Sequence, residues 1–296
     1  MQAFYHRDYY FPLPEGHPFQ MEKFPGGHAI VAREGRGITL RPAEPVTPGQ
    51  LARVHTPAYL EKVRTHAWVG SERTRMGLPA DPRLFARCAS ECGGTLQAGR
   101  AALAEGIAAN LGGGTHHAAA DRASGFCLFN DVAVALRALR VEHPDLFVFV
   151  LDTDAHQGDG THALFSTDPR VFTYSIHVGR NFPARKVPGD CDVPLERYAD
   201  GPTYLDALRR TLETAFLAFE PDLVFWVAGA DVHRDDRFGQ LCLDREAIES
   251  RNRFVLDLVR SWQVPLAIVY GGGYNREVAL TNRLHAEPVL RAGERR

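Results

Sequence analysis

The sequence lacks features that would assign it to a membrane, secreted or nucleic-acid-binding class. No run approaches the roughly 18 apolar residues that a membrane-spanning helix needs. The first 16 residues, MQAFYHRDYYFPLPEG, contain no apolar signal-peptide core. The 34 lysines and arginines do not outnumber the 36 aspartates and glutamates, so the basic excess of most nucleic-acid-binding proteins is missing. We therefore expect a cytoplasmic protein with no direct membrane or nucleic-acid partner.

Cysteine is also scarce, with five residues in the whole chain. Only Cys88 and Cys92 lie close together, on a predicted helix, and no second pair completes a zinc site. We interpret all five as reduced thiols. The composition, 45% hydrophobic and 24% charged, is ordinary for a globular protein. With no internal repeat or low-complexity linker, we expect a single domain over residues 1–296.

Short apolar runs predict the strands of the fold, and they are residues 107–111, 146–152, 171–176, 223–229 and 266–271. Near-continuous apolar runs are typical of strands that are covered on both faces. Apolar residues recur with helical spacing at 131–140, 204–219 and 245–262, whereas 11–25 and 181–194 look like loops. This alternation predicts an α/β fold, a doubly wound, mostly parallel sheet flanked by helices.

Each apolar run ends in polar or glycine-rich residues. In chain order these endings are GGGTHH, TDAHQGDG, HVGRNFP, ADVHRDD and GGYN. Ligands of open parallel sheets bind outside the carboxyl ends of the strands. We therefore expect all five segments to contribute side chains to one site.

Asp154, His156 and Asp231 are the candidate metal ligands. Two carboxylates and one imidazole suit Zn²⁺ or a similar divalent ion, and three protein ligands leave a position open for water and substrate. For Asp154 and His156 alone, turn capping and simple packing would be the better interpretation. The position of Asp231 at the end of another strand favours a metal site.

His116 and His117 are the candidate acid and base groups, because imidazole titrates in the range that proton transfer to water and amines requires. Asp152 and Asp159 are suitable carboxylate partners, although Asp159 could instead cap a turn. Tyr274 follows three glycines and could donate a hydrogen bond to a developing oxyanion. For each motif alone, a surface loop or a plain glycine turn is the alternative.

Phe126 and Phe182 are candidate walls of a narrow tube for an aliphatic chain, with ordinary core packing as the alternative. The glycine-rich segments lack the spacing of a dinucleotide-binding loop.

Together the segments resemble the zinc-dependent histone deacetylase family, which includes bacterial acetoin-utilisation proteins and acetylpolyamine amidohydrolases. They are GGGTHHAAADRASGFCLFND, LDTDAHQGDGTH, YSIHVGRNFP, AGADVHRDDRFG and YGGGYN, in the order of the family. The resemblance covers residues from about 50 to 280. Gln157, where many members carry histidine, is similar to the short class IV type and its bacterial relatives.

The resemblance implies an arginase/deacetylase-like fold and hydrolysis of the amide bond of acyl-lysine. It assigns Asp154, His156 and Asp231 to Zn²⁺, with Fe²⁺ as the alternative metal. His116 and His117 would be the acid–base pair. A structural K⁺ would be bound by Asp152, Asp154, His156, Ser175 and Ile176, several of them through backbone carbonyls.

The remaining implied roles concern the substrate. Asp152 and Asp159 would support the two histidines, and Tyr274 would polarise the acyl carbonyl. Gly125, Phe126, Phe182 and Phe238 would line the acyl-lysine tunnel. The stretch 70–82 would correspond to the rim loop, in which the acidic substrate clamp of many eukaryotic members has no clear counterpart.

Other functions receive less support from the sequence. An acetylpolyamine or another small acylated amine is the nearest alternative to an acyl-lysine protein as substrate. A non-catalytic acyl-lysine-binding module is expected to lose a metal ligand or the tyrosine, and both are present. A dimanganese arginase site is disfavoured because Gly158 stands where arginases carry a second-metal aspartate. Acyl-chain preference and oligomeric state stay open.

Overall fold

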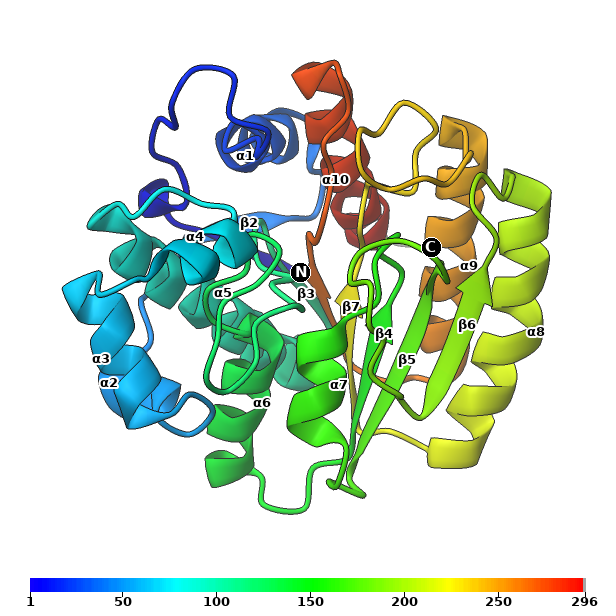
Figure 1. Cartoon of the computed structure of the whole chain (residues 1–296). Helices are drawn as coiled ribbons and strands as arrows, with labels where there is room; N and C mark the ends of the chain where they lie inside the picture. Colours follow the sequence, from blue (N-terminus) through cyan, green and yellow to red (C-terminus); the bar gives the residue numbers. More distant parts are fainter. Residues whose placement is uncertain (295–296) are drawn as a thin grey trace.

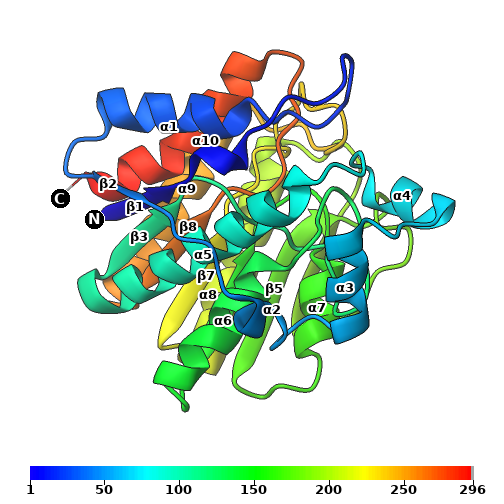
Figure 2. The same cartoon turned by 90° about the vertical axis from the view of Figure 1, so that its left-hand side faces the viewer.

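The computed structural model describes residues 1–294, which form one parallel sheet covered by helices on both faces (Figures 1 and 2). The sheet has eight strands in the order β2-β1-β3-β8-β7-β4-β5-β6, and every neighbouring pair is parallel. The predicted α/β architecture is therefore confirmed. The expected single domain also included residues 295–296, which lie outside the described part of the chain.

The five predicted strands are confirmed and three more complete the sheet. The predicted ones are β3 (Ile107–Asn110), β4 (Val148–Asp152), β5 (Val171–Val178), β7 (Leu223–Val227) and β8 (Leu266–Val269). The others are β1 (Gln2–Tyr5), β2 (Thr39–Pro42) and β6 (Cys191–Leu195). Strands β2 and β6 form the two edges of the sheet and contain no fully buried residue. In β4, β7 and β8 every residue is buried. The edge strands therefore lack the apolar run that marks these central strands in the sequence.

Helices cover the sheet in two groups. One group contains α2 (Pro48–Leu51), α3 (Pro57–Thr65), α4 (Gly70–Met76), α5 (Arg83–Glu105), α6 (Asp131–Glu142) and α7 (Asp159–Phe165). The other contains α1 (Lys23–Glu34), α8 (Gly201–Phe219), α9 (Arg245–Ser261) and α10 (Val278–Gly293). Figure 1 shows α5 and α6 on one side of the sheet and α8 and α9 on the other, while α1 packs along α10 (Figure 2).

The helix predictions hold to within a few residues, because side-chain caps mark the starts. Asn130 Oδ1 accepts a hydrogen bond from Ala133 N at 3.0 Å at the start of α6. The two loop predictions are wrong at their ends, since α1 begins at Lys23 and β6 begins at Cys191. None of the helices within residues 1–294 is long and apolar enough to cross a lipid bilayer.

Candidate functional site

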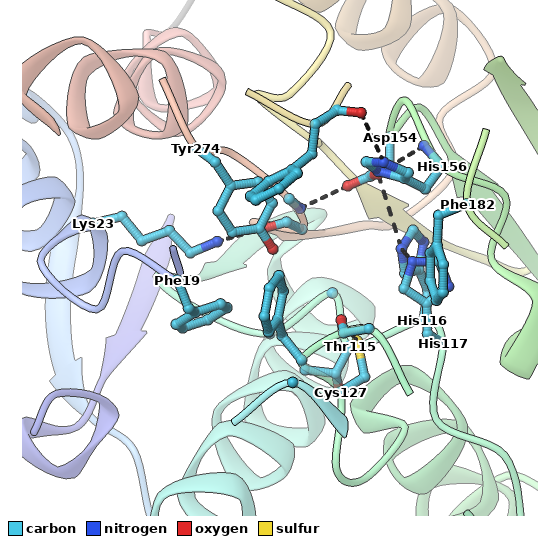
Figure 3. A pocket seen from close by; sticks show the side chains of 18 of the residues that line it. Phe19, Lys23, Thr115, His116, His117, Cys127, Asp154, His156, Phe182 and Tyr274 are labelled. Carbon is cyan, nitrogen blue, oxygen red and sulfur yellow. Dashed lines mark hydrogen bonds and ion pairs between the residues drawn. The ribbon is translucent and has the colours of Figure 1, made fainter. Parts of the chain in front are cut away.

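The carboxyl ends of the central strands bring the predicted polar segments to one place. Asp152, the last residue of β4, pairs in register with Val227 of β7, and Val227 pairs with Val269 of β8. The segments that follow these strands therefore start side by side. Figure 3 shows Asp154, His156, His116 and His117 on one side of a pocket that faces Tyr274. The expected convergence on one rim is thus observed.

Asp154, His156 and Asp231 form a compact cluster that is buried on all sides. Their candidate ligand atoms lie within 4.8 Å of one another. His156 Nδ1 lies 2.8 Å from Asp231 Oδ2 and 3.2 Å from Asp154 Oδ1. Both carboxylates are fully buried, at 0% exposure. Asp154 and His156 lie on one segment and Asp231 lies on another that is distant in sequence. Together they present one imidazole and two carboxylates, a donor set that suits a divalent cation.

Backbone groups hold the two carboxylates in place. Asp154 Oδ2 accepts a hydrogen bond from Gly272 N at 2.6 Å, and Asp231 Oδ1 accepts one from Ala155 N at 2.8 Å. Position 272 has room only for glycine, because a Cβ there would lie 2.4 Å from Asp231 Oδ2. The glycine-rich turn after β8 therefore closes directly on the cluster.

The electrostatics of the cluster also favour a bound cation. Burial and the negative charge of Asp154 raise the pKa of Asp231 to about 8. Burial alone would lower the pKa of His156, but the Asp154 and Asp231 carboxylates outweigh it and raise that pKa to about 10. A positive ion between the carboxylates would relieve their mutual repulsion. The residues present therefore fit the metal that the sequence predicts.

His116 and His117 each have the carboxylate partner that was expected. His116 Nδ1 lies 2.6 Å from Asp152 Oδ2, and His117 Nδ1 lies 2.7 Å from Asp159 Oδ1. The two Nε2 atoms are 3.1 Å apart beside the pocket. Since each Nδ1 faces a carboxylate, each Nε2 is the atom available for proton transfer.

The environments of the two histidines differ. Burial lowers the pKa of His116, but the charges of Asp152 and Asp154 exceed this effect and raise it to about 9. Burial and the positive charge of His116 lower the pKa of His117 to about 4, despite the hydrogen bond to Asp159. The pKa values of the two adjacent imidazoles are thus shifted in opposite directions, as they are in known acid–base pairs.

Asp131 supports the turn that carries both histidines. Its Oδ2 accepts hydrogen bonds from Thr95 Oγ1 at 2.6 Å and from Gly114 N at 3.0 Å, and its Oδ1 accepts one from Thr115 N at 2.7 Å. The side chain is fully buried. Asp131 is the first residue of α6. The sequence predicted that a helix begins there, but it did not indicate that Asp131 supports the turn with the two histidines.

We expect Asp131→Ala to lower the free energy of unfolding by about 3 kcal/mol, because it leaves several buried donors without an acceptor. Urea unfolding followed by circular dichroism would measure the change. The matched control is Asp244→Ala at the start of α9, where one backbone bond from Ala247 N is lost and about 1 kcal/mol is expected. An equal loss in both variants would contradict this role of Asp131.

A cavity of about 300 Å³ extends from the histidines to the protein surface. Phe126, Phe182 and Phe238 line it, and Phe182 is 44% exposed while Phe238 is 36% exposed. The Phe182 ring packs edge-on against His117 with 4.9 Å between ring centroids. The predicted tunnel residues therefore line one aromatic passage that leads to the reactive groups.

Gly125 makes this passage possible. It lines the same cavity and has a φ of +51°. A Cβ at this position would lie 2.6 Å from His117 Cδ2 and 2.8 Å from the Phe182 ring. A larger residue would therefore narrow the passage at His117.

Tyr274 lies on the opposite wall of the cavity. Its backbone N donates a hydrogen bond to Asp236 Oδ2 at 2.6 Å, and Asp236 Oδ1 accepts from Phe238 N at 2.9 Å. Burial raises the pKa of the Tyr274 phenol well above its usual range, so the hydroxyl keeps its proton and can donate it in a hydrogen bond. Asp236 thus fixes the tyrosine and a tunnel residue together, which the sequence had not indicated.

The residues predicted to bind K⁺ also lie close together, and two of them, Asp154 and His156, belong to the cluster itself. Asp152, Asp154 and His156 belong to one short segment, and Asp152 pairs in register with Ser175 on β5. Ile176 follows Ser175, and all five residues are buried. The Ser175 hydroxyl lies 2.9 Å from His177 Nδ1. K⁺ binding stays a prediction.

Two further features could not be inferred from sequence spacing. Lys23 Nζ, fully buried, donates to Gly271 O at 2.9 Å and lies 5.0 Å from the centre of the Tyr274 ring. Gln157 Nε2 donates to Asp192 Oδ1, and its Oε1 accepts from Val187 N. Gln157 therefore anchors the loop after Phe182. The partners of both residues are distant in sequence, so no local motif signals them.

Comparisons with known proteins agree with this geometry. A family model described as "Histone deacetylase domain" matches residues 17–286. An uncharacterised protein of Picosynechococcus sp. is 37% identical over 276 residues, which make up 93% of this chain and 92% of that protein. The acetoin utilization protein AcuC of Staphylococcus aureus is 36% identical over 182 residues, 56% of this chain and 46% of AcuC. This match therefore spans about half of AcuC.

A solved structure, the HD domain of HDA15, has the same fold. It matches with a TM-score of 0.81 at 21% sequence identity, and the match covers 98% of this chain and 87% of that one. The arrangement of the eight-stranded sheet and its helices is therefore shared with that domain.

Proposed function

Because the chain belongs to the histone deacetylase family, we propose that it is a metal-dependent deacylase that removes acetyl or other acyl groups from acyl-lysine. One observation carries the proposal. The cluster of Asp154, His156 and Asp231, the paired histidines and Tyr274 border a single site that an aromatic passage connects to the surface. We further propose that residues 1–296 act as one catalytic domain in the cytoplasm.

Asp154, His156 and Asp231 would hold the metal, which we propose to be Zn²⁺, with Fe²⁺ as the alternative. When bound, such an ion acts as a Lewis acid toward a carbonyl oxygen and lowers the pKa of water. A structural K⁺ would be held by Asp152, Asp154, His156, Ser175 and Ile176, several of them through backbone carbonyls.

The side chains around the cavity can carry the proton transfers. His117, neutral at pH 7 and held at Nδ1 by Asp159, can accept a proton at Nε2 as a water oxygen attacks the acyl carbon. The Tyr274 hydroxyl can donate a hydrogen bond to the carbonyl oxygen as negative charge develops on it. The carbon–nitrogen bond then breaks, the leaving amine takes a proton from an imidazole of the pair, and a carboxylate remains.

The aromatic passage is suited to a linear amine. Phe126 and Phe182 face the route to the histidines, and apolar rings favour the methylene chain of lysine over a branched or charged group. An acetylated polyamine also contains a methylene chain, and it is therefore tested beside acyl-lysine.

A substrate panel on zinc-loaded protein tests the proposal. The panel contains acetyl-lysine peptides, longer acyl-lysine peptides, acetylated polyamines and a trifluoroacetyl-lysine reporter. We expect turnover of at least one acyl-lysine substrate, complete loss on chelation, and a decrease in kcat of about 100-fold or more in Tyr274→Phe, because one oxyanion donor is removed.

Tyr198→Phe is the matched control, since Tyr198 is 66% exposed and does not line the cavity; its kcat should stay unchanged. Preferential turnover of the acetylated polyamines would identify them, instead of acyl-lysine, as the substrate class. Zinc binding without turnover of any panel member would contradict the proposed deacylase activity.

A further inference from the structure

Arg75 gives the mouth of the cavity its charge. Of the described residues that line the cavity, it is the only charged one whose side chain is exposed. The other lining residues with charge, Lys23, Arg87, Glu91 and Asp154, are buried. A substrate that enters the cavity therefore passes the exposed guanidinium group of Arg75, whereas the carboxylates among the described lining residues, Glu91 and Asp154, are buried.

The position of Arg75 is fixed by the tunnel wall itself. Its Nε donates a hydrogen bond to Ala123 O at 3.0 Å. Its backbone O accepts one from Gly125 N at 3.0 Å, and Met76 O accepts one from Phe126 N at 2.8 Å. Since Nε is the one guanidinium group that donates a hydrogen bond to a residue within 1–294, the two terminal amino groups stay available for a ligand.

The two acidic residues of the rim segment, Glu72 and Asp81, form their ion pairs with other side chains, although the positive charge of Arg75 also contributes to lowering the pKa of Glu72. Glu72 pairs with Lys62 and also accepts from Val69 N. Asp81 uses both carboxylate oxygens to bind Arg83. Within residues 1–294 no carboxylate forms an ion pair with Arg75.

The acid on the other side of the mouth is also unavailable. Asp236 accepts hydrogen bonds from the backbone N of Phe238, Gly239 and Tyr274. Both of its carboxylate oxygens thus accept hydrogen bonds from backbone N–H groups of two loops. Among the described residues that line the cavity, the one exposed charge is therefore a cation, the opposite of what a positively charged substrate requires.

We propose that Arg75 selects acyl-lysine segments with an acidic side chain next to the acylated lysine, and that it disfavours cationic amines such as acylated polyamines. A guanidinium binds a carboxylate through two parallel hydrogen bonds. The same positive charge repels the free ammonium groups of a polyamine. The inference rests on the proposed deacylase function and specifies the charge that the substrate carries beside the acylated lysine.

The test uses the full-length, zinc-loaded protein and pairs of acyl-lysine peptides of equal length. One peptide of each pair carries glutamate beside the acylated lysine, and the other carries lysine. At low ionic strength we expect kcat/KM to be about three- to fivefold higher for the acidic peptide, as for a partly exposed ion pair. The ratio should approach one in Arg75→Gln, reverse in Arg75→Glu, and decrease in high salt.

A change in the ratio of the two kcat/KM values distinguishes substrate selection by Arg75 from a purely structural role. Distortion of the cavity wall would lower kcat/KM for both peptides alike. Arg73→Gln is the matched control: Arg73 is exposed on the same helix but does not line the cavity, so the wild-type ratio should remain. Equal hydrolysis of both peptides by the wild type, or an unchanged ratio in Arg75→Gln, would overturn the inference alone. Failure to hydrolyse any peptide would overturn the deacylase function and this inference with it.

Discussion

Asp231→Asn is expected to reduce bound zinc from about one ion per chain to almost none and to lower kcat/KM by about 1,000-fold or more. The substitution replaces one of the two carboxylates of the cluster by a neutral amide that is a weak metal ligand. The loss is large because a Lewis acid contributes several kcal/mol to the stabilisation of the transition state. Metal content by mass spectrometry and turnover of the best panel substrate would measure both effects.

Asp190→Asn is the control for this prediction. Asp190 accepts hydrogen bonds from Thr173 N and Oγ1 close to the same sheet, but it is not part of the cluster. We expect this variant to keep its zinc and its activity. Full zinc occupancy in Asp231→Asn would show that the cluster is not the metal site.

His117→Ala is expected to lower kcat by about 1,000-fold while zinc remains bound. The variant removes the imidazole whose Nε2 faces the cavity, but it leaves Asp154, His156 and Asp231 intact. Single-turnover kinetics with a saturating substrate, together with zinc analysis of the same sample, would separate proton transfer from metal loss.

His28→Gln is the matched control, because His28 stacks on Tyr5 and does not line the cavity. Its kcat should equal that of the wild type. Comparison with His116→Ala would then divide the acid and base roles between the two histidines. If His117→Ala retained most of its activity with zinc bound, the proton transfers would have to be assigned to another group.

The central part of the fold was predictable because burial on both faces leaves a direct mark on composition. Every residue of β4, β7 and β8 is buried, and apart from Asp152 at the end of β4 their residues are all apolar. The edge strand β2 has three exposed residues out of four, so its sequence resembles a loop. The same reason applies to β6, which contains Pro194 and has no fully buried residue.

The sequence by itself determined which polar side chains meet at the site, because the Asp154, His156 and Asp231 cluster, the histidine pair and Tyr274 follow strand ends that a parallel sheet must place on one rim. It could not determine which residues support or border that site. Asp131 meets Thr95 and Gly114, and Arg75 meets Ala123, across distances that no local pattern encodes. These contacts depend on how loops pack after the strands have aligned, and so only the tertiary structure decided the charge and width of the entrance.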